Sequence, residues 1–315
     1  MKTMTANKIA PNFFIIGAPR CGTTALCEYL EHHPRIGFSR PKETHFFATD
    51  LPNVQAADLP PAGSVKTQVD YVQRCFGHCA GREYLQIGDG SVWHLYSHEA
   101  VANILRFDPS ARFIIMVRNP IDLCRSHYEK SCEMLWEDQP SFEAAWRAQD
   151  SRHCGRHVSS LCPDSRLLIY GEIAKLGEQV ERAFALIPAG QRLVIVYDDF
   201  ARDTAAVYTQ VLSFLGVPHD GRGDFPRINE AQKVRHRRLW RAIVRALTVA
   251  VRFKNKLIGP KSLGIYAALS PHFLAKKTGG AAPIADALRR EMKDYFADDV
   301  RRLSTLLNRD LSHWA

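Results

Sequence analysis

The sequence predicts an α/β fold in which helices cover both faces of a parallel sheet. The first observation is that short apolar runs alternate with longer amphipathic stretches along the chain, a pattern typical of βαβ units. The second is that RFIIMV (112–117) and RLVIVY (192–197) are apolar almost throughout, as expected of strands covered on both sides. The third is a turn rich in glycine and small residues directly after FFIIG (13–17).

In the first third of the chain, each predicted element has its own local signal. FFIIG (13–17) is a buried strand, and the helix over 22–32 ends near the pair of histidines before Pro34. YLQIGDG (84–90) is the second strand, and a helix follows it to about Arg106. Apolar periodicity supports each of these assignments.

The rest of the chain repeats the alternation. The strand at 112–117 precedes Pro120, which suits a helix start because its missing N–H has no partner to lose there. Apolar periodicity predicts the other elements: helices over 141–150 and 166–187, a fourth strand at 192–197, and a helix over 203–215 that Gly216 closes.

The turn after the first strand has the spacing of a phosphate-binding loop. Gly17 and Gly22 match the glycines of G-x-x-x-x-G-K-[ST], but Thr23 stands where the lysine would be, and the loop's cation is Arg20. Backbone N–H groups and the helix dipole still favour a phosphate here. Without the lysine, the loop suits a phosphate-bearing donor other than a nucleoside triphosphate.

Three motifs in this order resemble those of sulfotransferases that use 3′-phosphoadenosine 5′-phosphosulfate (PAPS), in the bacterial and heparan-sulfate-type branch. FFIIGAPRCGTTAL is similar to their 5′-phosphosulfate loop, HHPRIGFSRPKETHFF (32–47) to the next segment, and ARFIIMVRNPIDLCRSHY (111–128) to their 3′-phosphate element. Weaker similarity continues to the C-terminal end. The resemblance implies one P-loop-like sulfotransferase domain over 1–315.

The implied reaction moves the sulfuryl group of PAPS to a hydroxyl, or less readily an amine, of a carbohydrate or small-molecule acceptor. Adenosine 3′,5′-bisphosphate is released, and the motifs require no metal. In this family the loop holds the 5′-phosphate, which assigns donor binding to Arg20, Cys21, Gly22, Thr23 and Thr24. Arg20 would also stabilise the charge that grows on the leaving phosphate. The alternative is that Thr23 and Thr24 only cap the helix.

The resemblance assigns the 3′-phosphate of the donor to Arg118 and Ser126. Arg118 ends a buried strand, and ligands gather at the carboxyl ends of parallel strands. Ser126 lies about two turns into the next helix. The alternative for Arg118 is an ion pair with Asp122 across the turn.

Glu43 is the predicted general base, since the matching glutamate has that role in heparan-type enzymes. Phe46 and Phe47 follow it in PKETHFF, and we expect them to desolvate the carboxylate and raise its pKa. His45 is the rival base, because cytosolic sulfotransferases use a histidine. Lys42 is either a bridge between donor and reacting centre or a surface ion pair.

The segment GDGSVWHLYS (88–97) resembles an acceptor-side strand end. Glycosaminoglycan enzymes often carry a lysine before the small hydroxyl residue there, whereas this chain has Gly90 before Ser91. That departure weighs against a heparan-like acceptor. We interpret His94 and His98 as ordinary helix or loop histidines.

Composition limits the other partners. The formal net charge of +9 suits a polyanionic ligand. The sequence has no stripe of lysines and arginines interleaved with aromatic residues, so we do not expect nucleic-acid binding. Among the eight cysteines, only Cys75 and Cys79 are spaced like metal ligands, and no second pair matches them. No apolar run is long enough to span a membrane. We therefore expect a cytoplasmic protein with reduced thiols; the oligomeric state is left open.

The sequence allows two alternative functions, and it leaves the role of one basic segment undecided. A small-molecule kinase with an altered loop would depend on magnesium and ATP, and a non-catalytic nucleotide- or glycan-binding protein would bind without turnover. Residues 1–10 are expected to be a flexible N-terminus. The basic segment 231–258 is predicted to be an amphipathic helix, with a lid, a partner surface or a membrane surface as its possible roles.

Overall fold

The structure is a computed structural model that describes residues 9–52, 54, 65–228, 232–234, 274–276 and 283–314. The chain forms two compact units. The first comprises Met1–Cys124, Glu172–Ile228 and Arg289–Ala315, and the second comprises Arg125–Gly171 and Asn229–Leu288. The single domain over 1–315 stays a prediction, as does the flexible N-terminus over 1–10, of which residues 1–8 lie outside the described ranges.

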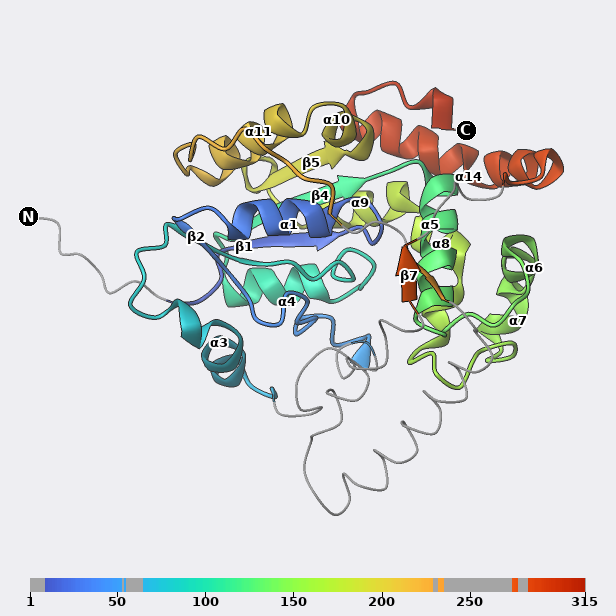
Figure 1. The fold of residues 1–315 in the computed structure, drawn as a ribbon, viewed down its shortest axis with the longest axis horizontal. Coiled ribbons are helices and arrows are strands. Elements are labelled where there is room, and N and C mark those ends of the chain that lie inside the picture. The colour runs from blue at the N-terminus through green and yellow to red at the C-terminus, as the bar shows by residue number, and fades with distance from the viewer. Residues whose placement is uncertain are drawn as a thin grey trace, which may run out of the picture. The chain divides into compact units, whose positions relative to one another are not determined.

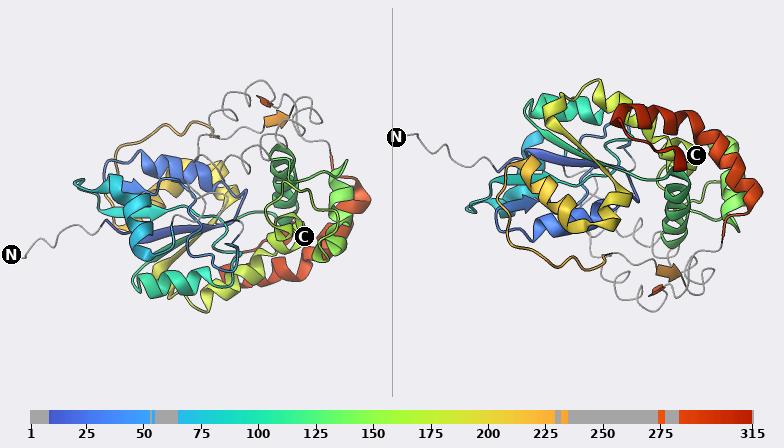
Figure 2. Two further views of the ribbon diagram at one scale, coloured as in Figure 1. Left: turned by 90° about the horizontal axis from the view of Figure 1, so that it is seen from below. Right: turned by 90° about the horizontal axis from the view of Figure 1, so that it is seen from above.

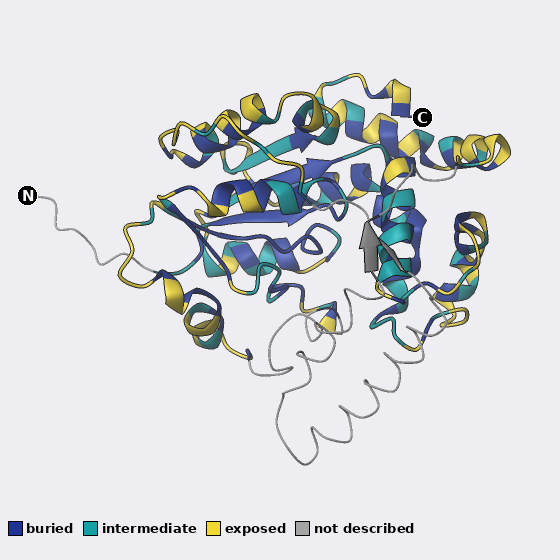
Figure 3. Cartoon of the chain, viewed as in Figure 1, coloured by how far each residue is buried: buried dark blue, intermediate teal, exposed yellow. Residues whose placement is uncertain are grey.

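The first unit is built on a five-stranded parallel sheet of order β2-β3-β1-β4-β5 (Figure 1). Almost all of the residues in its three central strands are buried, as Figure 3 shows. Such burial accounts for their continuous apolar sequence, since a parallel strand is covered on both faces. The strands are β1 (Phe13–Gly17), β2 (Ile36–Phe38), β3 (Gln86–Asp89), β4 (Arg112–Val117) and β5 (Arg192–Val196).

Helices cover both faces of this sheet. Figure 2 shows α1 (Thr23–Glu31) and α11 (Thr204–Leu215) on one face, and α4 (Ala100–Phe107) and α9 (Leu176–Phe184) on the other. Gly216 closes α11 in the left-handed conformation, with φ of 69°. The unit also contains α3 (Gln68–Phe76), η1 (Gly77–Cys79), η3 (Ala189–Gln191), α10 (Tyr197–Arg202) and η4 (Ser312–Trp314), and most of α14 (Asp286–Leu307).

The second unit holds most of α5 (Pro120–Glu133) and a buried polar cluster of its own. Arg152 is fully buried and pairs with Glu137 at 2.8 Å, and the Tyr170 hydroxyl donates to the same carboxylate at 2.6 Å. The other elements are α6 (Phe142–Arg147), α7 (Gln149–His153), η2 (Ser165–Leu168), part of α8 (Tyr170–Ala174), and the antiparallel pair β6 (Gln232–Val234) and β7 (Leu274–Lys276).

The predicted fold class, an α/β parallel sheet flanked by helices on both faces, is confirmed. The edge strand β2 is an addition, because its three residues are too few to give a periodic signal. The basic segment 231–258 was predicted to be helical, but Gln232–Val234 form strand β6. The rest of that segment lies outside the described residues. None of the described helices combines the length and the hydropathy that a membrane-spanning helix requires.

Candidate functional site

Two of the predicted binding elements, the phosphate loop and Arg118, follow the carboxyl ends of neighbouring strands. β1 lies between β3 and β4. The phosphate-loop sequence follows β1, Arg118 follows β4, and Asp89 ends β3. Ligands of parallel α/β sheets bind outside such strand ends. The sheet order therefore places the loop between the two other chemistry-bearing strand ends.

The loop after β1 leaves the first turn of α1 without a side-chain cap. Gly22 is the N-cap residue, with φ of 92°, and among the described residues no side-chain cap hydrogen bond is made at this helix end. The capping alternative for Thr23 and Thr24 is therefore wrong. A Cβ on Gly17 would stand 2.7 Å from the Leu95 Cβ, so that only glycine fits there. Uncapped N–H groups at a helix N-terminus suit a phosphate.

Cys21 is engaged inside this loop. Its backbone N–H donates to the Ala18 carbonyl at 3.3 Å, and its thiol donates to the Pro19 carbonyl at 3.6 Å. Burial raises the pKa of the thiol to about 12, which keeps the sulfur neutral. The proposed contact of Cys21 with the donor stays a prediction.

Arg118 is fixed beside the loop, and its buried Nε is left for a ligand. Its guanidinium donates to the Arg20 carbonyl at 3.1 Å and lies 4.4 Å from the centre of the Tyr197 ring. Its buried Nε has no hydrogen-bond partner within the described residues, and no ion pair joins it to Asp122 there. A buried, unsatisfied guanidinium donor is suited to an anion.

Ser126 lies on α5, beyond the boundary that separates the two units after Cys124. Its side chain is partly exposed. The pairing of Ser126 with Arg118 around one phosphate therefore stays a prediction.

Glu43 lies at the centre of a charged cluster. Its two oxygens contact the Lys42 ammonium at 2.5 Å and the His45 Nε2 at 3.3 Å. Burial raises the pKa of Glu43, but the hydrogen bond from His45 and the charge of Lys42 outweigh it and lower the pKa to about 2. The expectation of a raised pKa is therefore wrong. Phe46 stacks on Tyr71 instead, with ring centres 4.5 Å apart.

A buried carboxylate at the end of β3 holds the loop that carries Glu43. Asp89 is fully buried and accepts hydrogen bonds from the hydroxyls of Tyr71 at 2.7 Å, Thr44 at 2.5 Å and Ser91. The Ser91 hydroxyl in turn accepts the backbone N–H groups of Thr44 and His45, at 3.0 and 2.9 Å. The loop is thus tied directly to β3 by hydrogen bonds.

The sequence analysis did not predict the hydrogen bonds around Asp89, although it noted the sequence GDGS, which contains Asp89 and Ser91. The structure also gives a reason for Gly90. A Cβ there would stand 2.6 Å from the Cys27 sulfur and 3.6 Å from the Lys42 Cε. The site has no room for a lysine at position 90 unless Cys27 moves, and the stem of Lys42 runs past this glycine.

His94 is a further group at the site, and sequence reasoning set it aside. Its ring is fully buried 6.1 Å from the His45 ring, centre to centre, and neither nitrogen has a hydrogen-bond partner among the described residues. Burial and the charge of His45 hold the pKa of His94 well below its usual value. The imidazole is therefore neutral at physiological pH.

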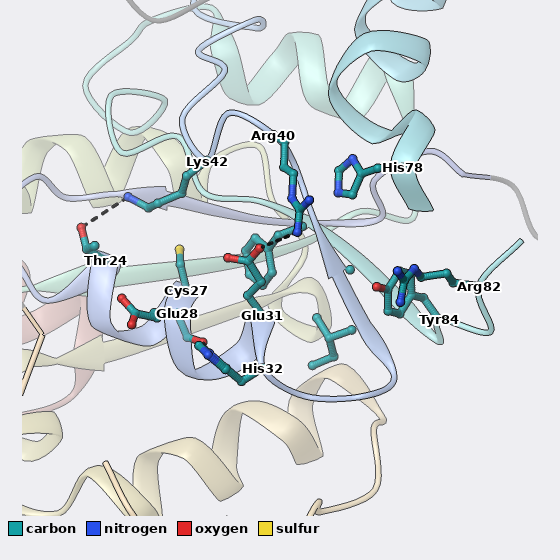
Figure 4. A pocket seen from close by; sticks show the side chains of 13 residues that line it. Thr24, Cys27, Glu28, Glu31, His32, Arg40, Lys42, His78, Arg82 and Tyr84 are labelled. Atoms are coloured by element: carbon teal, nitrogen blue, oxygen red, sulfur yellow. Dashed lines mark hydrogen bonds and ion pairs between the residues drawn. The ribbon is translucent and has the colours of Figure 1, made fainter. Parts of the chain in front are cut away.

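A pocket of about 590 Å³ opens beside Lys42 and Thr24. Figure 4 shows these two residues at one end, Arg40 and Glu31 paired in the middle, and Arg82 with Tyr84 farther along. The lining carries charges of both signs. It consists of Thr24, Cys27, Glu28, Glu31, His32, Ile36, Gly37, Phe38, Arg40, Lys42, His78, Arg82 and Tyr84.

Comparison with known proteins decides the family. The model of the sulfotransferase family matches residues 11–221, which include the phosphate loop, Glu43, Arg118 and Ser126. The chain belongs to the sulfotransferase family. The resemblance first seen in the motifs is therefore confirmed.

Individual relatives agree with this membership. Human carbohydrate sulfotransferase 15 is 26% identical over 38% of this chain, and human bifunctional heparan sulfate N-deacetylase/N-sulfotransferase 3 is 25% identical over 69% of it. The chain spans 27% and 24% of the length of these two relatives. A sulfotransferase structure from Alicyclobacillus acidocaldarius, 25% identical, matches with a TM-score of 0.66 over 97% of this chain and 98% of that one.

Within the described residues, no three His, Cys, Asp or Glu side chains gather in a way that would hold a metal ion. Metal-free catalysis and the cytoplasmic location both stay predictions.

Proposed function

We propose that this sulfotransferase transfers the sulfuryl group of PAPS to a hydroxyl of a carbohydrate or small-molecule acceptor. The observation that carries the proposal is a set of three elements: the uncapped start of α1 after β1, the Nε of Arg118 after β4, which has no partner among the described residues, and the Lys42–Glu43 pair, whose loop is hydrogen-bonded to Ser91 after β3. Together they supply phosphate binding, a second anion contact and a carboxylate base.

In this proposal the first turn of α1 binds the 5′-phosphate of the donor. The N–H groups of Thr23 and Thr24 and the Thr24 hydroxyl are the donors, and the helix dipole favours the negative charge. Arg118 and Ser126 bind the 3′-phosphate, which distinguishes this nucleotide from AMP, ADP and ATP. The stacking of Arg118 on Tyr197 supports the role, because it fixes the plane of the guanidinium.

Glu43 is the proposed base and Arg20 the proposed stabiliser of the leaving group. Glu43 accepts the proton of the acceptor hydroxyl while the new O–S bond forms. The bond between sulfur and the bridging phosphate oxygen breaks, and its electron pair stays on the phosphate of adenosine 3′,5′-bisphosphate. Arg20 lies in the loop before α1, where a cation stabilises that developing charge.

The acceptor is proposed to enter through the pocket beside Lys42 and Thr24. Its volume of about 590 Å³ lies within the range of small-ligand sites. Polar and charged side chains dominate its lining, including Glu28, Glu31 and Arg40, which suits a hydroxyl-rich acceptor. The carbohydrate named in a relative supports a glycan, whereas the N-sulfotransferase name keeps an amine acceptor as the second candidate.

The experiment that tests this function is a screen of hydroxyl- and amine-bearing acceptors with isotopically labelled PAPS, read by mass spectrometry. We expect a product heavier by one labelled sulfuryl group, formed without added magnesium and strongly reduced with Glu43→Gln. A chain that binds adenosine 3′,5′-bisphosphate but sulfates no acceptor would favour the non-catalytic alternative. Phosphate transfer from ATP with magnesium would favour the kinase.

A further inference from the structure

Lys42 occupies the space between the proposed base and the donor loop. Its ammonium lies 2.5 Å from a Glu43 oxygen and 3.4 Å from the Thr24 hydroxyl. Thr24 belongs to the first turn of α1, where the donor phosphate is proposed to bind. One ammonium group therefore contacts both halves of the reaction centre, as Figure 4 shows on the Thr24 side.

The contacts that hold Glu43 differ in how easily they can be exchanged. The Lys42 side chain is 28% exposed, lines the pocket and has a flexible stem beside Gly90. His45 is fully buried, and its backbone N–H is fixed by the Ser91 hydroxyl. A negatively charged ligand at the start of α1 would therefore draw Lys42 away and leave His45 in place.

In the ligand-free site Glu43 is a poor base, and the departure of Lys42 would make it a better one. With Lys42 and His45 in contact, the pKa of Glu43 is about 2. A carboxylate of so low a pKa is a poor proton acceptor near neutral pH, because general-base catalysis is most effective when the pKa lies close to the working pH. Removing an adjacent opposite charge raises the pKa of a carboxylate by about 1–3 pH units.

We propose that Lys42 is a catalytic cation that moves from Glu43 to the sulfuryl group of the bound donor, and that this move frees Glu43 to accept the acceptor proton. The inference rests on the proposed function. It adds an order of events: the donor binds first, and the base becomes competent only when the donor is in place. An acceptor alone would meet a Glu43 that is still paired.

The reaction balances without a further reactant. The acceptor oxygen forms a bond to sulfur and loses its proton to Glu43, and the bond from sulfur to the phosphate oxygen breaks with its electron pair remaining on the phosphate. Lys42 keeps all three of its protons and contacts the sulfuryl oxygens throughout. It neutralises charge during the transfer and is neither acid nor base.

Other titratable groups face Glu43 from neighbouring elements. His45 lies on the same loop, Cys27 on α1, and His94 after β3. Burial raises the pKa of Cys27 to about 12 and lowers that of His94, so both are neutral. Among the described groups in contact with Glu43, Lys42 is the cation that can move, because the His45 side chain is fully buried.

The test follows the carboxyl signal of Glu43 by NMR in the full chain labelled with ¹³C-glutamate, identified by its loss in Glu43→Gln. In the free protein we expect the signal to stay ionised to the lowest pH at which the chain is folded. With PAPS bound, its titration midpoint should rise by about 1–3 pH units. An unchanged midpoint with PAPS bound would overturn the proposal.

Two variants at position 42 separate charge from structure. Lys42→Met should show the raised midpoint without any donor, and PAPS should add little to it. Lys42→Arg keeps the cation and should keep the low midpoint of the free protein. A Lys42→Met protein that titrates like the wild type would also contradict the proposal.

Calorimetry with adenosine 3′,5′-bisphosphate distinguishes a failure of the proposed function from a failure of the proposed Lys42 movement. If the wild-type chain does not bind this nucleotide, the proposed function itself fails. If the nucleotide binds but PAPS leaves the titration of Glu43 unchanged, only the movement of Lys42 is overturned.

Discussion

Replacing Ser91 by alanine is expected to loosen the loop that carries Glu43 while leaving nucleotide binding intact. The Ser91 hydroxyl accepts the backbone N–H groups of Thr44 and His45 and donates to the buried Asp89. A buried donor left without a partner costs about 1–3 kcal/mol, so losing the acceptor of two N–H groups costs about 2–6 kcal/mol. None of these contacts involves Arg20 or Arg118.

Thermal unfolding and turnover measure the two consequences. For a chain of this size about 2 kcal/mol lowers Tm by about 3 °C, and a displaced base lowers turnover by up to about 100-fold. Tyr71→Phe is the matched control, because it removes one hydrogen bond to Asp89 and leaves both loop N–H groups paired. Its Tm should fall less. Wild-type Tm and turnover in Ser91→Ala, or a parallel loss of nucleotide affinity, would refute the reasoning.

Three further outcomes are expected. Arg118→Ala should weaken adenosine 3′,5′-bisphosphate binding by about 10- to 100-fold in calorimetry and leave AMP binding nearly unchanged; equal weakening would assign Arg118 to the fold. Glu43→Gln should lower turnover by about 100-fold or more with unchanged bisphosphate affinity, and His45→Ala should be milder; near-normal turnover in Glu43→Gln would transfer the base to His45. Because the folded state lowers the pKa of Glu43 to about 2, the carboxylate contributes stability above its unfolded pKa that is lost as the pH falls through the folded value. The Tm difference between wild type and Glu43→Gln should therefore shrink as the pH falls below about 4; a constant difference would mean that the charge of Glu43 contributes nothing.

The sheet was largely predictable because its signal is local. Strand β4 matches the predicted residues 112–117, and the helix over 203–215 ends at Gly216 as expected. The predicted helix over 166–187 is instead split into η2, α8 and α9. Short interruptions of this kind arise from tertiary packing, which periodicity does not record.

The site was predictable as a set of residues but not as an electrostatic arrangement. Motif spacing identified the loop, Arg118 and Glu43, because phosphate and proton chemistry require particular residue types there. The pKa of Glu43 depends instead on Lys42 and His45 both reaching the same carboxylate. The neighbouring aromatics suggested desolvation alone, so the sequence argument had the wrong sign.

The role of Asp89 could not be predicted from the sequence for a related reason. Two of its three hydrogen-bond donors, at positions 44 and 71, are distant in sequence and meet Asp89 and its neighbour Ser91 only at the end of β3. A buried aspartate inside an apolar strand was the available signal, since such a group has to find partners.

The most direct test of the central claim is calorimetric titration of the chain with adenosine 3′,5′-bisphosphate and, separately, with ATP and magnesium. The loop without a P-loop lysine at position 23, together with Arg118, predicts that the bisphosphate binds much more tightly than ATP and that magnesium makes no difference to its affinity. Tighter binding of ATP with magnesium than of the bisphosphate would contradict a PAPS-dependent sulfotransferase.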